Sequence, residues 1–405
     1  MDSEARKIDI AELEVGMHLE DVFNDKGVCL YAANTLISNP DQIEKLKRQK
    51  VSSVYINIYK GRDTTSPPPA PGTRTVANSR AERVELDYYK ELPQARAVRR
   101  DALVAAKEVM DTIRKGRSFS VESIEKSAED IVDSILRNPD ALISLCQIKG
   151  HDEYTYTHSV NVGILVTSLA ASMDYREEQL LHTGIGGLLH DVGKMRVPDS
   201  ILNKPGRYAD WEFGIMKKHP AHGIDIIKGK KAISEDARKV VLQHHERCDG
   251  SGYPFSLTAE NISEIGLIAA VADVYDALTS DRVYRAAWTP QKALALIFQG
   301  ADSQYSKTIV ERFTRHLGIY PVGSFVRLVS QEMGIVVRIE KGKLLAPIVL
   351  ILFDAGGRRL KEPVEYDLFK MQQTNNENNH KIEMSLDPRV FRINVGEYLE
   401  GKAVT

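Results

Sequence analysis

Histidine is concentrated in one stretch of this chain, and that stretch restricts what the chain can fold into. Eight of the eleven histidines lie between His151 and His245. Several stand in short blocks: His190-Asp191-Val192-Gly193-Lys194, His219-Pro220-Ala221-His222-Gly223 and His244-His245-Glu246. A core gains nothing in packing from collecting imidazoles, whereas imidazoles with carboxylates form a ligand set for Fe, Mn or Zn. The fold is therefore expected to gather these blocks around metal, which favours metal-assisted hydrolysis.

The composition limits the class of protein. A length of 405 residues predicts two or three domains, and 42% hydrophobic residues can supply their cores. The net charge of −2 gives no support for general nucleic-acid binding. The three cysteines show no paired spacing, so neither a disulfide framework nor a zinc ribbon is expected. The chain contains no run of about 18 apolar residues, and we expect no membrane contact and a cytoplasmic location.

The pattern along the chain predicts a mainly α fold in five segments. Residues 1–62 read as a small α+β accessory domain, with a hairpin-type turn at 24–27 and a helix over 41–50. A proline-rich linker is expected over 63–80 and a helical connector, broken at Pro93, over 81–150. The histidine-bearing helical core spans 151–317. A β-rich extension over 318–405 is expected to pack on the helices.

The acidic and imidazole side chains of the core stand at informative places on the predicted helices. His158 ends an apolar stripe, where a lone histidine would more often be a core residue. His190 and Asp191 end a helix, so adjacent ligands can reach two metals with the carboxylate between them. Asp273 lies in an apolar run, where a carboxylate needs a partner and a metal supplies one.

Four further residues complete this constellation. His219 precedes a proline and is expected to be extended before a helix. His244 and His245 are expected to end another helix, just before a glycine-rich loop. Lys194 follows Asp191 by about one turn and could orient a phosphate oxygen; simple capping of the helix end is the alternative.

The whole series resembles the HD-GYP domain, a branch of the HD metal-dependent phosphohydrolases. The resemblance covers roughly residues 120–370 and rests on the blocks quoted above, on Gly250-Ser251-Gly252-Tyr253-Pro254 and on the run 271–285. It implies a helical HD-type core and a bacterial phosphodiesterase that acts on cyclic di-GMP. The opening segment resembles the small N-terminal domain that often precedes HD-GYP domains.

The match to the motif also implies roles for individual residues. The metal ligands would be His158, His190, Asp191, His219, His244, His245 and Asp273. Asp191 would bridge two metals and Lys194 would assist catalysis. Gly252, Tyr253 and Pro254 would shape a substrate loop. Arg282 and Arg285 would grip a phosphate or a guanine edge, sharing a face if they lie on a helix, although a solvated helix face explains that spacing equally well.

One departure from the family pattern affects the expected product. Some members hold a third metal with a glutamate four residues before the first histidine, and here that position is Tyr154. A site for two divalent metals is therefore expected. Fe or Mn suits the ligands best, and Zn or Ni could be present in purified protein. The linear dinucleotide pGpG is expected as the main product, with GMP left open.

Two other readings remain open. The chain could be a catalytically slow HD-GYP protein that senses ligand and docks on a partner such as a GGDEF-type cyclase. It could also hydrolyse another nucleotide, such as cyclic GMP-AMP or a guanosine polyphosphate. The sequence leaves the role of the opening segment open, and formation of a homodimer is a guess from its position.

Overall fold

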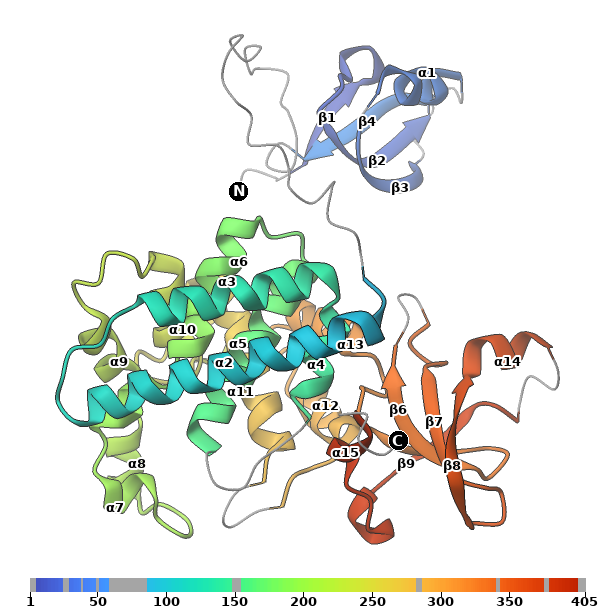
Figure 1. Ribbon diagram of the computed structural model, residues 1–405. Coiled ribbons are helices and arrows are strands. Elements are labelled where there is room, and N and C mark those ends of the chain that lie inside the picture. Colours follow the sequence, from blue (N-terminus) through green and yellow to red (C-terminus); the bar gives the residue numbers. More distant parts are fainter. Residues whose placement is uncertain are drawn as a thin grey trace. The chain divides into compact units, whose positions relative to one another are not determined.

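The computed structural model describes residues 5–24, 29–37, 39–48, 51–57, 86–147, 154–281, 286–339, 343–374 and 379–399. The chain divides into two compact units, Met1–Ser79 and Arg80–Thr405. Helices dominate the second unit and small antiparallel sheets occur in both, which confirms the predicted fold class (Figure 1). None of the described helices has the length and apolar character needed to cross a membrane. The five segment boundaries stay a prediction.

The first unit is a four-stranded antiparallel sheet with one helix. Its elements are β1 (Ala5–Asp9), β2 (His18–Asn24), β3 (Cys29–Leu36), α1 (Pro40–Arg48) and β4 (Val51–Asn57), in the strand order β1-β4-β2-β3. Val54 and Ile56 alternate along β4 and are completely buried, as one face of a half-covered sheet requires. The expected helix is confirmed. Residues 25–27 of the expected turn and the whole linker over 63–80 lie outside the described residues.

The second unit is a bundle of helices followed by a sheet. The helices are α2 (Tyr88–Arg114), α3 (Glu122–Arg137), α4 (Pro139–Leu145), α5 (Tyr154–Ser172), α6 (Glu177–Leu189), α7 (Asp199–Leu202), α8 (Asp210–Met216), α9 (His219–Ile227), α10 (Glu235–Gln243), α11 (Glu264–Thr279), α12 (Pro290–Gln299) and α13 (Lys307–Leu317), with the 3₁₀ turn η3 (Val192–Arg196) after α6.

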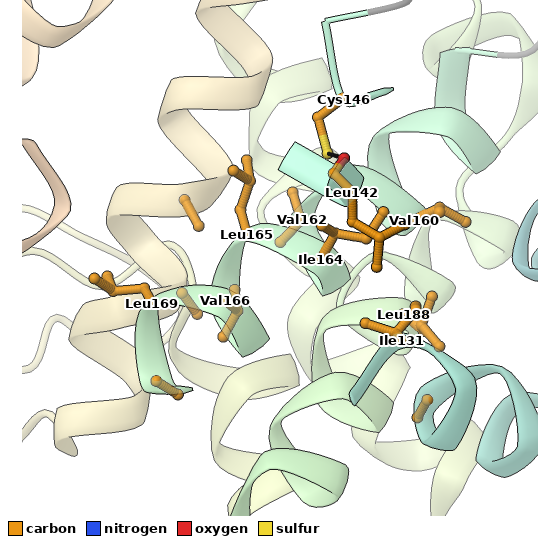
Figure 2. Close-up of a cluster of buried hydrophobic side chains, with 14 of the residues drawn as sticks. Ile131, Leu142, Cys146, Val160, Val162, Ile164, Leu165, Val166, Leu169 and Leu188 are labelled. Atoms are coloured by element: carbon orange, nitrogen blue, oxygen red, sulfur yellow. Dashed lines mark hydrogen bonds between the residues drawn. The ribbon is translucent and has the colours of Figure 1, made fainter. Parts of the chain in front are cut away.

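Helix α5 lies in the middle of this bundle. Its residues from Val160 to Ala170 are almost completely buried on every side, which only a helix surrounded by others can be. Figure 2 shows Leu165 and its neighbours on α5 together with Leu142 of α4, Ile131 of α3 and Leu188 of α6. This packing fixes the position of α5, and with it His158 near the start of the helix, which belongs to the candidate site.

The expected helix break at Pro93 is wrong, because α2 continues through this residue. Proline there removes one hydrogen bond, to the carbonyl group of Tyr89. The turn before it is held by tertiary contacts instead. Tyr88 donates to Ser144 Oγ at 3.1 Å, and the buried Glu91 accepts from Arg137 Nε at 2.8 Å. These contacts outweigh the local signal.

The β-rich extension is a five-stranded antiparallel sheet. Its elements are β5 (Phe325–Leu328), β6 (Met333–Arg338), β7 (Ile348–Phe353), β8 (Arg359–Asp367), α14 (Leu368–Thr374), β9 (Ile382–Leu386) and α15 (Val395–Leu399), in the strand order β8-β7-β6-β5-β9. Phe325 and Val326 point into separate apolar clusters on its two faces. Arg338 pairs with Asp87 just before α2 at 3.5 Å, and Arg96 of α2 donates to the carbonyl oxygen of Leu399 at 3.5 Å. The sheet thus packs on the helices, as expected.

Candidate metal centre

All seven predicted ligands meet at one place in the helical unit. His158 lies on α5, His190 and Asp191 follow the last turn of α6, and Asp273 lies on α11. The other three are His219 at the start of α9 and His244 and His245 after α10. Every one except His245 is buried, with 0–7% of its surface exposed. Five helices therefore bring imidazoles and carboxylates together in the protein interior. Residues of such polarity rarely gather in an interior without a functional reason.

The seven side chains form two clusters that could each hold a metal ion. The first cluster is Asp191, His219, His244 and His245, and the second cluster is His158, His190 and Asp273. Within each cluster the potential ligand atoms all lie within 4.8 Å of one another.

Asp191 faces both clusters with different oxygens. Its Oδ1 lies 3.2 Å from His219 Nε2 and 3.7 Å from His244 Nε2. Its Oδ2 lies 3.4 Å from His190 Nε2 and 3.6 Å from His158 Nε2. A carboxylate in this position can bridge two cations, as the sequence predicts.

Three of the histidines are oriented by the helix ends on which they stand. The Nδ1 atoms of His190, His219 and His244 lie 2.8, 2.8 and 2.9 Å from the carbonyl oxygens of the residues three before them, Gly187, Met216 and Val241. Carbonyl groups in the last turn of a helix have no partner within the helix, so they are available to accept. Donation from Nδ1 leaves the Nε2 lone pair directed at the centre, as metal ligation requires.

His158 is oriented by a carboxylate instead. Its Nδ1 lies 2.8 Å from Asp276 Oδ2, and Asp276 also accepts from Asn161 Nδ2 at 2.9 Å and Ser280 Oγ at 3.3 Å. Sequence reasoning did not assign this contact to Asp276. The signal was present, since Asp276 follows Asp273 by three residues and so lies on the same face of α11.

The electrostatics of the two clusters differ. Burial would raise the pKa of the Asp191 carboxyl, but Lys194 and His190 outweigh burial and lower this pKa well below its usual value. Burial lowers the pKa of His219, and it lowers the pKa of His245 to about 3. The first cluster thus presents neutral imidazoles at neutral pH.

His158 behaves in the opposite way. Burial would lower its pKa, but the hydrogen bonds to Asp273 and Asp276 outweigh burial and raise the pKa to about 9. His158 is therefore protonated at neutral pH in the metal-free protein and must release a proton to become a ligand.

Two orphaned atoms show that these residues fit a metal. His190 Nε2 and Asp191 Oδ1 are buried and have no hydrogen-bond partner. Leaving such atoms unsatisfied costs about 1–3 kcal/mol each, which a cation between them removes. The mixture of neutral imidazole nitrogens and carboxylate oxygens is the donor set of a divalent transition metal.

Lys194 is placed at the edge of this centre. Its Nζ lies 2.5 Å from Asp191 Oδ2, and 19% of its side chain is exposed. The ammonium group therefore pairs with the carboxylate that lies between the two clusters, and its role in catalysis stays a prediction.

The expectation that His219 is extended is wrong, because it is the first residue of α9. Proline in the first turn needs no hydrogen-bond partner, so Pro220 permits the helix to begin here. The contact of His219 Nδ1 with Met216 O then holds the ring. Gly193 packs directly against this turn, where a Cβ atom would lie 1.8 Å from the carbonyl oxygen of His219. Only glycine allows η3 to approach α9 so closely.

The loop with the predicted substrate contacts Gly252, Tyr253 and Pro254 lies against the first cluster. The Tyr253 ring lies 4.6 Å from the His245 ring, between centroids. Glu246 is buried and accepts from the backbone N–H groups of Phe255 at 2.8 Å and Leu257 at 2.9 Å. Sequence reasoning gave Glu246 no role, although it directly follows the histidine pair.

The predicted phosphate contacts Arg282 and Arg285 lie outside the described residues. Helix α11 ends at Thr279, and Ser280 is extended with φ −103° and ψ 141°.

Several known proteins are similar to this chain in sequence. The HD domain family matches residues 140–309, and a domain of unknown function (DUF3391) matches residues 5–124. A cyclic di-GMP phosphodiesterase of Pseudomonas aeruginosa is 36% identical over 81% of this chain and 79% of its own length. Two Vibrio cholerae proteins match shorter parts. A cyclic di-GMP phosphodiesterase is 44% identical over 31% of this chain and 27% of its own length, and a 3'3'-cGAMP-specific phosphodiesterase is 33% identical over 42% and 33%.

The fold and the clustered ligands define an HD-domain metal-dependent phosphohydrolase. Within that class, the chain belongs to the HD-GYP family.

Proposed function

We propose that this protein is a metal-dependent phosphodiesterase that hydrolyses a 3'-5' phosphodiester bond of cyclic di-GMP to give pGpG. The observation that carries the proposal is Asp191, whose two oxygens face two buried imidazole clusters in a chain of this family. The relative of the same activity that matches over 81% of the chain supports the choice of substrate.

The chemistry follows from the arrangement of the chain's own groups. A pair of divalent metals, when bound, neutralises charge on a phosphoryl group and lowers the pKa of water. His219, His244 and His245 would hold one ion, His158, His190 and Asp273 the other, and Asp191 would fix the spacing between them.

Lys194 completes the proposed reaction. Water adds to phosphorus, the bond from phosphorus to the 3' oxygen breaks, and that oxygen must gain a proton as it leaves. The Lys194 ammonium, which borders Asp191 and is partly exposed, is the group we assign to supply it. The loop at Tyr253, against His245, would confine the substrate on the open side. Contacts from Arg282 and Arg285 stay a prediction.

Several finer assignments belong to the same proposal. Two ions of Fe or Mn suit the ligands best, with Zn or Ni as substitutes in purified protein. Tyr154, in place of a glutamate, favours two metals over three and pGpG over GMP. A GGDEF-type partner, a homodimer and a cytoplasmic location stay predictions from the sequence.

Cyclic GMP-AMP is the second candidate substrate. The observation in its favour is the 3'3'-cGAMP-specific relative from Vibrio cholerae, which matches 42% of this chain. The slow sensor is less well supported, because all seven ligands and Lys194 are present and in contact.

The decisive experiment is an assay of protein purified without oxygen and loaded with Fe²⁺ or Mn²⁺. Cyclic di-GMP and cyclic GMP-AMP are supplied in parallel, and products are separated by chromatography. We expect pGpG from cyclic di-GMP, lost in His190→Ala and Asp191→Ala. His182→Ala is the matched control, since His182 lies on α6 but in neither cluster, and it should retain activity. A metal-loaded protein that cleaves neither dinucleotide would reject the proposal.

A further inference from the structure

Helix α8 exposes an aromatic side chain beside the candidate metal centre. The packing of the fold does not need this side chain. Phe213 is 42% exposed, and it belongs to none of the buried apolar clusters formed by the described residues. The anchor of α8 is Met216, which is buried against Val197 and Ile201. A single exposed Phe is common on protein surfaces, so a role for Phe213 has to be inferred from the groups next to its ring.

A continuous series of rings leads from Phe213 to the first cluster. The Phe213 and Tyr253 rings are 6.2 Å apart between centroids and meet edge to face at 83°. Tyr253 in turn lies 4.6 Å from the His245 ring and 6.2 Å from the His219 ring. Phe213 is thus linked to the candidate ligands His245 and His219 through a single intervening ring, that of Tyr253.

The charge around Phe213 suits the rest of a nucleotide. Lys217, one helical turn further on, places Nζ 4.8 Å from the centre of the Phe213 ring. Lys217 and Lys218 are both exposed and stand immediately before His219. An ammonium over an exposed ring is held by only about 0.5–1 kcal/mol, so it can move to a phosphate when a base takes its place.

We propose that Phe213 is the stacking platform for one guanine base of the bound cyclic dinucleotide, with Lys217 turning from the ring to the phosphate. The inference rests on the proposed function and adds to it a substrate-binding residue. Every base has a π face, and stacking on an aromatic side chain is sequence-tolerant. Phe213 therefore contributes to binding of either purine dinucleotide rather than to the choice between them.

The test compares substitutions that keep or remove the π face. Phe213→Leu retains an apolar side chain without a ring, and we expect KM for cyclic di-GMP to rise about tenfold with kcat within about twofold. Phe213→Tyr should restore the wild-type KM. Trp211→Leu is the matched control, because Trp211 is 65% exposed on the same helix but two residues earlier, and therefore points to another side. Its KM should be unchanged.

Two results would overturn the inference. One is a Phe213→Leu protein with wild-type KM, and the other is an equal rise in KM for Trp211→Leu. Isothermal titration with cyclic di-GMP separates this inference from the proposed function. Wild-type protein that binds without turnover rejects the function, and the Kd values of the same variants then decide the role of Phe213. Wild-type protein that neither binds nor cleaves the dinucleotide rejects both.

Discussion

The two ligand clusters share Asp191 but are supported in different ways. In the first cluster, backbone carbonyl oxygens orient His219 and His244, and burial keeps their rings neutral. In the second cluster, the side chain of Asp276 orients His158 and, with Asp273, keeps it protonated in the absence of metal.

This difference means that the first cluster is ready to bind metal, whereas metal binding at the second cluster can be controlled. Backbone carbonyl groups cannot be changed by substitution and carry no full charge, so the first cluster is set by the fold itself. In the second cluster a backbone carbonyl oxygen orients His190, but His158 depends on a side chain and on a proton. The affinity of this cluster for metal therefore responds to pH and to single substitutions. The predictions below test this contrast, from the largest expected effect to the smallest.

Asp191→Asn should damage both clusters at once. The amide nitrogen cannot be a ligand for whichever cluster it faces, and the shared negative charge is lost. We expect turnover to fall by more than about 1,000-fold and metal content to drop at both positions. Elemental analysis and the dinucleotide assay measure the two effects. Full occupancy of both clusters in this variant would show that they do not depend on a shared carboxylate.

Asp276→Asn should act on the second cluster alone. It keeps the shape of the side chain but removes the charge behind His158, and loss of such a partner weakens metal affinity by about 10- to 100-fold. One ion should then be lost to a chelator while the other stays. Ser280→Ala, which removes only the 3.3 Å hydrogen bond to Asp276, is the milder control. Equal loss of both ions would contradict the contrast.

The pH dependence of metal uptake should differ between the clusters. The raised pKa of His158, about 9, means that its proton competes with metal at lower pH. Affinity at the second cluster should therefore rise by up to about tenfold per unit between about pH 7 and pH 9. The lowered pKa values of His219 and His244 predict little change at the first cluster. Titration of metal-free protein with Mn²⁺ in two buffers would count the released proton, and identical pH profiles would reject the distinction.

Gly193→Ala should disturb the first cluster through the backbone. The new Cβ would overlap the carbonyl oxygen of His219 at 1.8 Å and force η3 away from α9. We expect the free energy of unfolding to fall by about 2–4 kcal/mol and the first cluster to lose metal.

Gly214→Ala is the matched control for this substitution. Gly214 lies within α8 and its Cβ would meet nothing within 4 Å, so stability should stay the same or rise by up to about 1 kcal/mol. Thermal unfolding of both variants provides the measurement. Equal stability of the two proteins would show that the approach of η3 to α9 is not essential.

The sequence predicts the candidate ligands at helix ends well because local sequence patterns determine where those helices end. The block at His190 ends a helix and the pair at His244 follows another, so motif spacing and helix periodicity together place them. The family resemblance joined these blocks into one set, and the structure brings the same seven residues together. Whether all seven bind metal stays a prediction.

Features that depend on distant contacts were missed or wrong. The helix through Pro93 depends on Arg137 and Ser144, which follow it by more than 40 residues. The pairing of β9 with β5 joins strands separated by three others, and no local pattern indicates that order. The helical start at His219 depends on the end of the preceding helix. At Pro93 a tertiary contact outweighed a correct local preference, whereas the contact that holds His219 is only three residues away.

The position of Glu246 affects how mutation can change the substrate preference of such an enzyme. This buried carboxylate directly follows the ligand His245 and holds the backbone of the loop just beyond Pro254. Glu246 therefore links a candidate metal ligand to the loop that is proposed to contact the substrate. A mutation that moves this loop also shifts His245, so a new substrate preference is more readily acquired through exposed side chains outside the loop than through the loop itself.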